Sequence, residues 1–484
     1  MPQCTIELKD EVNCKIHNLD LSTRRECENK LKYFMPHAYH TPAYKLGRWD
    51  GCVSYFTPGG GTYINMLDTV IDVLNKNNYN IELKDKRNNH NFNFNKINAN
   101  LHNNITWPPG HPSENKAIQL RDYQVEIINQ FLEEPQCLQE VATGAGKTII
   151  TATLSKLVEQ YGRTIVIVPN KDLVNQTFND YQNIGLDVGV YFGDKKDIGK
   201  THTICTWQSL NIINKKFKDA ESDMSLADFA QDVVCVIIDE VHQAKADVLK
   251  QLLTGAFARV PLRWGLTGTV PKDDWAYAAL KASIGAVSRR LGAAELQDKG
   301  VLAECQVNIL QLEDNCVYND YQSELKFLTS DTDRMNYLSK MILNISESGN
   351  TLVLVDRIKA GQILAENLGE ETVFISGSTK TKDRQETYAD VQTATGKIII
   401  ATYGVASVGI NIPRIFNLVL VEPGKSFIRV IQSIGRGIRK AEDKDHVEIW
   451  DITSTAKFSK RHLTERKKFY NEARYPYTIK KMKY

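Results

Sequence analysis

The run from Val141 to Thr148, VATGAGKT, has the residue types and spacing needed to hold a phosphate chain. It follows a short apolar stretch and precedes a helix-compatible segment, so glycine N–H groups and a helix N-terminus would surround the phosphates. We expect Lys147 to reach the β- and γ-phosphates of ATP and the Thr148 hydroxyl to bind Mg²⁺. The predicted cradle consists of Thr143, Gly144, Ala145, Gly146, Lys147 and Thr148. Val141 stands where the pattern usually begins with glycine, so a chance match is the competing interpretation.

A second run supplies two carboxylates at the end of an apolar strand. Residues 233–238, VVCVII, predict a buried strand that delivers Asp239 and Glu240 at its end. Asp239 would hold Mg²⁺ and Glu240 would orient or deprotonate the attacking water, which are the two tasks that phosphoryl transfer requires. A solvated acidic pair in a loop is the alternative. His242 follows and is predicted to link the nucleotide to the nucleic-acid side, or else to be a surface histidine.

A third candidate group is basic. Gln432, Arg436 and Arg439 are spaced i, i+4 and i+7, so a helix would place them on one face. Arginines so arranged can stabilise the charge of the transition state, an effect worth roughly 10³–10⁵ in rate when they act as arginine fingers. The alternative is a solvated basic helix face.

Composition limits the classes of protein to consider. The chain has 484 residues, of which 42% are hydrophobic and 24% charged, and a formal net charge of +2. A nucleic-acid surface must therefore be local. The nine cysteines form no CxxC pair, which predicts free thiols in a reducing cytoplasm. Neither a signal peptide nor a membrane span is expected, so we predict a cytoplasmic location, the host cytoplasm if the chain is encoded by a phage.

The elements that would position these residues form an α/β pattern. Apolar runs at residues 164–168 and 233–238 alternate with helix-like segments, and a second series occurs at 351–355, 372–376, 397–401 and 418–421. The second series has no GKT, so we expect two parallel-sheet lobes that share one nucleotide. An Asn/Lys-rich stretch at about 75–104 and the run PPGHP at 108–112 are typical of loops and a linker. The predicted domains are 1–112, small and α+β, then 113–303 and 304–484, the last with a basic C-terminal helix.

Seven segments in this order resemble the superfamily 2 helicases. They are Leu120–Gln124, the GKT cradle, Val168–Asn170, Thr206–Ser209, Asp239–His242, Leu266–Thr269 and Ala401–Asn411, followed by the helix Gln432–Arg439. Within that superfamily the chain is similar to the UvsW-type recombination helicases of bacteriophages. That similarity rests on Tyr44–Gly51 and an alternating strand at Cys52–Phe56, and on Thr402–Val405 and Val421 onward in the motor.

The resemblance implies RecA-like lobes and several residue roles. Gln124 would read the adenine, Thr267 and Thr269 would couple the lobes, and Ser407 and Gly409 would line the cleft between them. The full set of further nucleotide-binding residues is Arg121, Gln124, Gly409 and Asn411. The sequence departs from the family pattern at two places. Asn411 stands where Asp is common, so a contact of this residue with the nucleotide does not follow from the resemblance. Thr-Gly-Thr at 267–269 replaces the commoner Ser/Thr-Ala-Thr.

Contacts with a nucleic-acid strand are expected in loops that follow the strands of the two lobes, and should be directed mostly at phosphates. The candidates are Asn170, Lys171, Gln208, Ser209, Ser376, Gly377 and Thr402. Trp207 is as well explained by packing as by stacking. In the N-terminal domain Arg48 and Trp49 are candidates for duplex or junction binding. The alternative is that Trp49 is a core residue and Asp50-Gly51 a hairpin turn. The basic C-terminal run 457–468 and 480–483 would track a backbone or form a solvated, frayed helix.

Together these features predict an ATP- and Mg²⁺-dependent DNA helicase or translocase that remodels forks, Holliday junctions or D-loops in recombination, repair and replication restart. The family implies 3′ to 5′ polarity. We expect a monomer that binds single-stranded and branched or duplex DNA, does not act on membranes, and has recombination or single-strand-binding proteins as candidate partners. The alternatives are an RNA helicase, the motor of a restriction system, and a junction-binding ATPase switch without motor activity.

Overall fold

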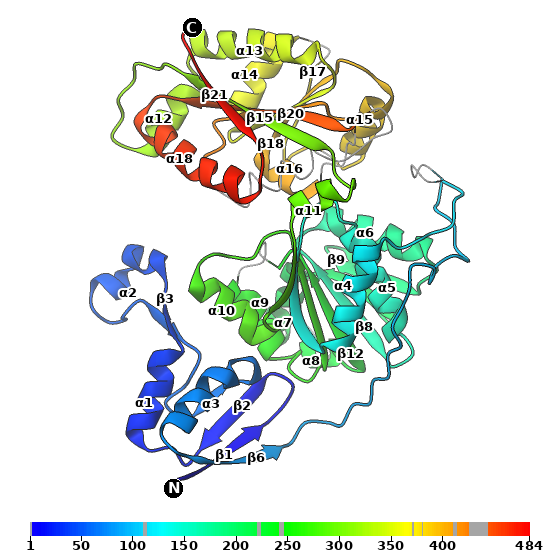
Figure 1. Cartoon of the computed structure of the whole chain (residues 1–484), viewed down its shortest axis with the longest axis vertical. Coiled ribbons are helices and arrows are strands. Elements are labelled where there is room, and N and C mark those ends of the chain that lie inside the picture. Colours follow the sequence, from blue (N-terminus) through cyan, green and yellow to red (C-terminus); the bar gives the residue numbers. More distant parts are fainter. Residues whose placement is uncertain are drawn as a thin grey trace. The chain divides into compact units, whose positions relative to one another are not determined.

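The computed structural model describes residues 2–109, 114–219, 224–241, 246–369, 372–379, 381–409, 414–424 and 444–484. The chain forms two compact units (Figure 1). The first unit comprises Met1–Val141 and Gly146–Arg290, and the second comprises Ala142–Ala145 and Leu291–Tyr484. Each unit is built around its own mainly parallel sheet, which confirms the predicted α/β class. Within the described ranges, none of the helices has both the length and the apolar character that a membrane span needs.

The N-terminal module, residues 3–85, contains a four-stranded sheet in the order β5-β2-β1-β6. Its strands are β1 (Gln3–Leu8), β2 (Asn13–His17), β5 (Gly61–Tyr63) and β6 (Asn80–Asp85), and its longer helices are α1 (Leu21–Lys30) and α3 (Leu67–Lys76). Alternate residues of β1 and β2 are buried because one face of the sheet packs on the helices. Strand β6 pairs in parallel with β1, so the prediction of a loop was wrong for residues 80–85.

A second, two-stranded sheet joins β3 (Lys32–Phe34) to β4 (Cys52–Ser54) in antiparallel pairing. The connection between them, residues 35–51, carries the 3₁₀ helix η1 (Pro36–His40) and the helix α2 (Pro42–Lys45). Another 3₁₀ helix, η2 (Ile64–Met66), precedes α3. The Asp50-Gly51 pair is therefore the end of a long connection. The alternative interpretation of it as a two-residue hairpin turn was wrong.

The N-terminal module packs directly on the part of the first unit that contains the larger sheet. Ala278, Ala279 and Ala282 of α10 (Asp274–Ser283) lie in the same buried cluster as Ile6 and Val70 of the module. Further along the chain, the Asn-rich stretch is held against the unit: Tyr161 accepts a hydrogen bond from the Asn93 N–H at 2.9 Å and donates one to the Asn93 carbonyl at 2.7 Å. The stretch predicted as a linker is thus docked by specific contacts.

The larger sheet of the first unit has eight strands in the order β10-β9-β11-β8-β12-β13-β7-β14. The strands are β7 (Gln136–Val141), β8 (Arg163–Val168), β9 (Val188–Phe192), β10 (Lys195–Lys196), β11 (His202–Thr206), β12 (Val233–Asp239), β13 (Leu262–Thr267) and β14 (Val287–Leu291). Strands β7, β8, β9, β11, β12 and β13 run parallel, and β10 is antiparallel to β9. The predicted strands at 164–168 and 233–238 are confirmed.

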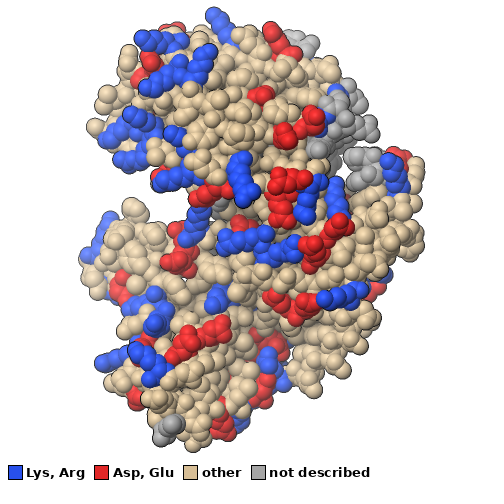
Figure 2. Space-filling view, viewed as in Figure 1, with Lys and Arg blue, Asp and Glu red and all other residues tan. Residues whose placement is uncertain are grey.

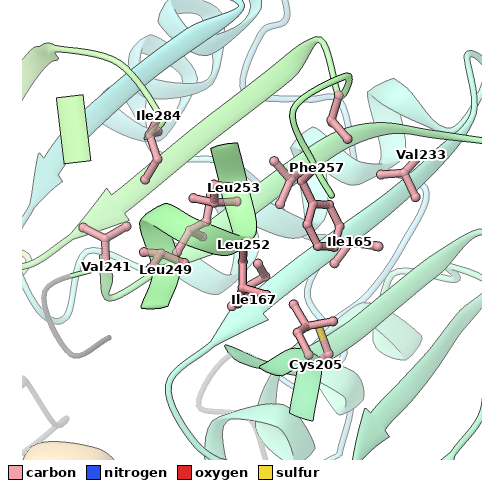
Figure 3. Close-up of a cluster of buried hydrophobic side chains, with 14 of the residues drawn as sticks. Ile165, Ile167, Cys205, Val233, Val241, Leu249, Leu252, Leu253, Phe257 and Ile284 are labelled. Atoms are coloured by element: carbon pink, nitrogen blue, oxygen red, sulfur yellow. The ribbon is translucent and has the colours of Figure 1, made fainter. Parts of the chain in front are cut away.

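Helices cover this sheet and complete its core. They are α4 (Asp122–Glu133), α5 (Lys147–Val158), α6 (Lys171–Asn183), α7 (Trp207–Lys218), α8 (Leu226–Phe229) and α9 (Ala246–Thr254), together with α10. Figure 3 shows part of the core, where Ile165 and Ile167 of β8 face Leu252 of α9 and Phe257. Strands buried on both faces are nearly continuous apolar runs, which explains why the sequence pattern identified them.

The second unit has a seven-stranded, all-parallel sheet in the order β17-β18-β16-β19-β20-β15-β21. The strands are β15 (Glu304–Leu312), β16 (Thr351–Val355), β17 (Thr372–Ile375), β18 (Ile398–Thr402), β19 (Asn417–Val421), β20 (His446–Ser454) and β21 (Tyr477–Met482). The helices are α11 (Ala293–Asp298), α12 (Tyr321–Leu328), α13 (Thr332–Ser346), α14 (Ile358–Leu368), α15 (Thr381–Thr393), α16 (Tyr403–Gly409) and α18 (Lys457–Glu472). The four strands predicted for this lobe are confirmed.

The C-terminal segment is an integral part of this second sheet. Strand β21 pairs in parallel with β15, from Val307 opposite Tyr477 to Leu312 opposite Met482. The Tyr484 hydroxyl then donates a hydrogen bond of 2.5 Å to Asp314 Oδ1. Residues 477–484 are therefore neither a free basic tail nor a frayed helix end, although α18 itself is the basic helix that the sequence predicted.

Candidate nucleotide-binding and nucleic-acid-binding sites

The glycine-rich loop leaves the carboxyl end of β7 and enters α5, the strand-to-helix context that phosphate binding needs. Gly144 and Gly146 have φ of 91° and 80°, in the left-handed region where side chains are rarely tolerated. A Cβ on Gly146 would lie 2.6 Å from Gln124 Nε2, so the loop and α4 also approach too closely for a side chain. Lys147 is the first residue of α5, which places it at the positive end of the helix dipole.

Lys147 and Glu240 form the central contact of the site. Lys147 Nζ lies 2.9 Å from Glu240 Oε1 and donates a second hydrogen bond of 3.3 Å to the Val141 carbonyl. The exposed fractions of Lys147 and Glu240 are only 9% and 6%. Since a charge with so little access to water needs a partner, each of these groups is held by the other. The structure thus brings together the lysine of the first predicted run and the second carboxylate of the second run.

Glu240 also contacts a third segment, through its other carboxylate oxygen. The Gly268 N–H donates to Glu240 Oε2 at 3.2 Å. Gly268 is flanked by Thr267 and Thr269, and the Thr267 hydroxyl donates to the Thr269 carbonyl at 2.8 Å and accepts from the Thr269 N–H at 3.2 Å. Glu240 itself has φ of 51°, a conformation that is uncommon for a residue other than glycine. The contact with Gly268 was not predicted, because residues 28 positions apart give no local pattern.

Asp239 and Thr148 are the predicted magnesium ligands. Asp239 is the last residue of β12, is partly exposed, and accepts a 2.9 Å hydrogen bond from the Glu240 N–H on Oδ1. Thr148 is the second residue of α5 and is also partly exposed. Both follow strands of one parallel sheet and lie at its carboxyl edge, and a carboxylate with a hydroxyl is an oxygen donor set that suits Mg²⁺.

Gln124 and Arg121 differ in how closely they approach the loop. The buried Gln124 accepts a 2.9 Å hydrogen bond from the Arg121 N–H on Oε1, and its Nε2 faces Gly146. Arg121 is exposed and donates to the Tyr123 hydroxyl at 2.9 Å. The carboxamide of Gln124 is therefore fixed against the glycine-rich loop, as a residue that recognises a nucleotide base would be, whereas the Arg121 side chain contacts its own helix.

Several predicted residues have no described position. His242, Asn411, Gln432, Arg436 and Arg439 lie outside the described residues. Gly409 is the last residue of α16. The proposed roles of these six residues stay predictions.

The candidates for strand contact in the first unit follow β8 and β11, at the same edge of the sheet as the cradle. Lys171, Gln208 and Ser209 lie in the first turns of α6 and α7, so the prediction that they lie in loops was wrong. Asn170 caps α6: its Oδ1 accepts from the N–H groups of Asp172 and Leu173 at 3.1 Å, and its Nδ2 is a buried donor with no hydrogen-bond partner. Lys171 and Gln208 are exposed, and Gln208 Nε2 donates to the Pro169 carbonyl at 3.1 Å. Lys171 and Gln208 are therefore accessible at the ends of the strands, whereas the Asn170 carboxamide is used to cap α6.

Two further residues of that group are already engaged in packing. Ser209 is buried, and its hydroxyl lies 2.9 Å from the Thr206 hydroxyl, which caps α7. Trp207 packs against the core of the first unit. The packing interpretation of Trp207 is the one that the structure favours, and Ser209 can reach a nucleic acid only if this cap rearranges.

In the second unit the candidates follow β17 and β18. Ser376 is buried, and its hydroxyl lies 2.8 Å from the Ser378 hydroxyl. Gly377 is exposed with open space around it, and Thr402 ends β18 with partial exposure. Gly377 and Thr402 are therefore accessible at the carboxyl edge of the second sheet. Gly377 lies in a turn after β17, as predicted, whereas Thr402 is the last residue of β18 and not a loop residue.

The two candidates in the N-terminal module lie before β4. Arg48 is exposed, whereas Trp49 is partly buried and donates from Nε1 to the Cys52 carbonyl at 2.8 Å. Trp49 thus fastens the end of the β3–β4 connection. The alternative interpretation of Trp49 as a core residue was wrong, because the side chain is partly exposed and lies outside the buried cluster of the module. Its role in DNA binding stays a prediction.

The comparisons with known proteins agree with this geometry. A family model described as "Type III restriction enzyme, res subunit" matches residues 117–272, and one described as "Helicase conserved C-terminal domain" matches residues 333–441. The first covers the glycine-rich loop, the acidic pair and the Gly268 segment, and the second covers most of the second unit. The chain belongs to the superfamily 2 helicases, whose two helicase domains it carries in order.

Among its relatives the chain is similar to the ATP-dependent DNA helicase UvsW of Enterobacteria phage T4. The two are 24% identical over 74% of this chain and 73% of the phage protein. It is also 28% identical to the DNA 3′-5′ translocase XPB2 of Sulfurisphaera tokodaii, over 44% of this chain and 46% of the archaeal one. A solved fragment of an HsdR subunit of a type I restriction enzyme from Vibrio vulnificus shares the fold, with a TM-score of 0.58 and 16% identity over 75% of this chain and 68% of the fragment.

Proposed function

We propose that this helicase is a DNA helicase or translocase that uses ATP and Mg²⁺, moves 3′ to 5′, and remodels branched DNA in recombination, repair and replication restart. The observation that carries the proposal is the position of Glu240, which touches Lys147 with one oxygen and the Gly268 N–H with the other. One carboxylate is thereby in contact with the phosphate-binding segment and with the segment that the family uses to couple ATP hydrolysis to movement.

The residues present fit ATP and Mg²⁺. The loop has its two left-handed glycines, Lys147 begins a helix, and Thr148 and Asp239 offer oxygen ligands. When bound, ATP supplies a phosphoanhydride bond whose hydrolysis changes the charge held in the site. Lys147 would neutralise phosphate charge, and Gln124 would orient the base from its position beside Gly146. Asn411 and Gly409 would complete the pocket, and Gln432, Arg436 and Arg439 would sense the γ-phosphate.

Glu240 would hold the proton of the attacking water on Oε1, the oxygen that contacts Lys147. For that, the Lys147–Glu240 contact of 2.9 Å must be exchanged for contacts with the nucleotide and water. Glu240 Oε2 can keep the Gly268 N–H throughout, since the two oxygens serve different partners. A change of charge at Oε1 would then be felt at the Thr267–Thr269 turn, which is the kind of local event that shifts a two-state element.

DNA is proposed as the substrate because UvsW is named a DNA helicase and XPB2 a DNA 3′-5′ translocase. The contacts would be made mainly to phosphates by Asn170, Lys171, Gln208, Gly377 and Thr402, so they would not depend on sequence. On the second unit, Lys and Arg predominate over α18 and β21 on the visible face, whereas both signs mix elsewhere (Figure 2). That local basic surface is suited to a backbone.

The experiment that tests the proposal measures steady-state ATP hydrolysis by the full chain with single-stranded DNA, duplex, fork, four-way junction and RNA of equal nucleotide content. We expect stimulation by DNA, strongest with branched DNA, and displacement of the labelled fork strand that corresponds to 3′ to 5′ movement. Equal stimulation by RNA would favour an RNA helicase. Stimulation by linear duplex alone would favour a restriction-type motor, and nucleotide-dependent junction binding without turnover would favour a switch.

A further inference from the structure

An aromatic and basic surface projects from the N-terminal module in the β3–β4 connection. Phe34, Tyr39 and Tyr44 form a mutual cluster, with ring centroids 5.1 Å apart for Phe34–Tyr39, 5.9 Å for Phe34–Tyr44 and 5.3 Å for Tyr39–Tyr44. These rings are not buried together: Tyr39 is 56% exposed and Phe34 37% exposed, and the neighbouring Leu46 is 64% exposed. We call these four residues the aromatic platform.

The charged residues within the connection itself have one sign. Residues 35–49 contain no Asp or Glu but include Lys45 and Arg48, both exposed, and His37 and His40. The next carboxylate along the sequence, Asp50, forms an ion pair with Lys32 at 2.5 Å. The platform therefore combines exposed rings with cations. An anion bound there would meet no repulsion from residues 35–49.

The platform is also held in a defined position. The Met35 N–H donates to the Gly51 carbonyl at 2.8 Å, and the His37 ring contacts Trp275 of α10 with centroids 5.4 Å apart. Gly51 has φ of +77°, and a Cβ there would lie 2.6 Å from Phe34 and 2.9 Å from Tyr44. The absence of a side chain at position 51 thus lets the rings close over it. In Figure 1 this connection, with α2, extends away from α1 and α3.

We infer that the aromatic platform is a stacking surface for unpaired bases of a nucleic acid at a branch point. This inference rests on the proposed function and names a substrate feature for it. A duplex presents its phosphates outward and keeps its bases stacked and paired, so cations alone suffice to bind it. Exposed rings would find no free base face on a duplex and would add no affinity. Unpaired bases expose their faces, and stacking of a base on an aromatic side chain is sequence-tolerant. Rings beside Lys45 and Arg48 match that combination of base face and phosphate.

The test compares binding of the full chain to a fork with unpaired bases at its branch and to a blunt duplex of equal length, by fluorescence anisotropy. We expect Tyr39→Ala to weaken fork binding roughly tenfold and duplex binding less than about twofold, because one base–ring contact is lost. Tyr39→Phe keeps the ring and should bind the fork like the wild type. Leu83→Ala removes an equally exposed apolar residue elsewhere in the module and should change neither affinity.

A second pair of variants tests the platform without removing any ring. Gly51→Ala and Gly47→Ala impose the same strain, since the φ values are +77° and +66°, but only at Gly51 would the new Cβ strike Phe34 and Tyr44. We expect Gly51→Ala to reproduce the loss on the fork and Gly47→Ala to have a much smaller effect. A 2-aminopurine at the unpaired position should show quenching with the wild type and lose it with Gly51→Ala.

The inference is overturned if Tyr39→Ala weakens fork and duplex equally, which would make the surface a duplex-binding one. It is also overturned if neither Tyr39→Ala nor Gly51→Ala changes fork binding, which would leave the platform to a protein partner. These failures differ from failure of the proposed function, because stimulation of wild-type ATP hydrolysis by single-stranded DNA would remain in both.

Discussion

At the scale of single residues, Glu240 is the group on which the proposed chemistry depends. Its two oxygens are divided between Lys147 and the Gly268 N–H, so the side chain is already oriented. Its partly strained backbone, with φ of 51°, is typical of functional positions that the surrounding structure holds in place.

We predict that Glu240→Gln lowers the rate of ATP hydrolysis by roughly 10²–10⁴-fold, the usual contribution of a general base, while single-strand binding stays within about twofold. Lys147→Ala should abolish turnover and also weaken nucleotide binding. Hydrolysis is measured by phosphate release and nucleotide binding by a fluorescent ATP analogue. If Glu240→Gln hydrolysed ATP normally, another group would have to handle the water.

A glycine pair tests the shape of the cradle. Gly146→Ala would add a Cβ 2.6 Å from Gln124 Nε2 at φ +80°, whereas Gly185→Ala, at φ +77°, would meet nothing within 4 Å. We expect both variants to lose about 1–2 kcal/mol of stability from backbone strain. Only Gly146→Ala should raise the KM for ATP, by about tenfold or more. A KM unchanged in Gly146→Ala would show that the loop does not approach a nucleotide as proposed.

At the scale of elements, the second unit depends on a buried ionic network at the carboxyl ends of its strands. Arg334 of α13 is fully buried, with Nε 3.0 Å from Asp314 Oδ1 and Nη2 2.7 Å from Glu422 Oε1. Ser459 of α18 donates to the other oxygen of Glu422 at 2.7 Å. The Glu422 carboxylate thus fastens two helices, α13 and α18, to the strand ends. Burial raises the pKa of Glu422, and the Arg334 guanidinium opposes that rise.

We predict that Arg334→Ala lowers the free energy of unfolding by about 3–5 kcal/mol near pH 8, because two buried carboxylates lose their partner. Without the guanidinium the folded-state pKa of Glu422 rises further above its unfolded value. A raised carboxyl pKa costs stability as pH increases through it, so the deficit should shrink when the pH is lowered to about 5. Urea unfolding of the wild type and of Arg334→Ala at both pH values measures this deficit.

Arg357→Ala is the matched control. That arginine is partly exposed and, among the described residues, donates to Gln322, so its loss should change stability by less than about 0.5 kcal/mol. A deficit in Arg334→Ala that stayed constant between the two pH values would contradict the assignment to unpaired carboxylates.

At the scale of the whole molecule, the N-terminal module is part of the motor's first unit. Tyr55 donates to the Trp275 carbonyl of α10 at 3.3 Å, and the Gln136 side chain at the start of β7 donates to the Glu11 carbonyl at 2.6 Å. Removing the module would expose the alanine face of α10, so its role in DNA binding is better tested by point substitutions.

We predict that Ala279→Asp lowers the Tm of the first unit by several degrees, since it places an unpaired charge in the shared core where Ala279 is 1% exposed. Asp274→Asn, at an exposed position of the same helix, should have a much smaller effect. Differential scanning calorimetry compares the two. If Ala279→Asp were no worse than Asp274→Asn, the module would be an independent domain.

The sequence by itself determined the class of fold, and it predicted the chemistry of the candidate nucleotide site. The buried strands of both lobes are continuous apolar runs, and the GKT loop and the acidic pair are local patterns whose spacing follows from backbone geometry. Short or half-exposed elements were missed, such as β6 in an Asn-rich stretch and β21 in a lysine-rich one, because pairing with β1 and β15 outweighs their weak propensity.

Only the tertiary structure decided which distant groups meet. The Glu240–Gly268 contact, the Arg334 network and the shared core of α10 join residues that are far apart in the chain, and a linear pattern carries no information about such pairs. It also decided that Trp49 fastens a loop while Tyr39 faces solvent. Local sequence sets what a residue is able to do, whereas packing sets which of its partners is within reach.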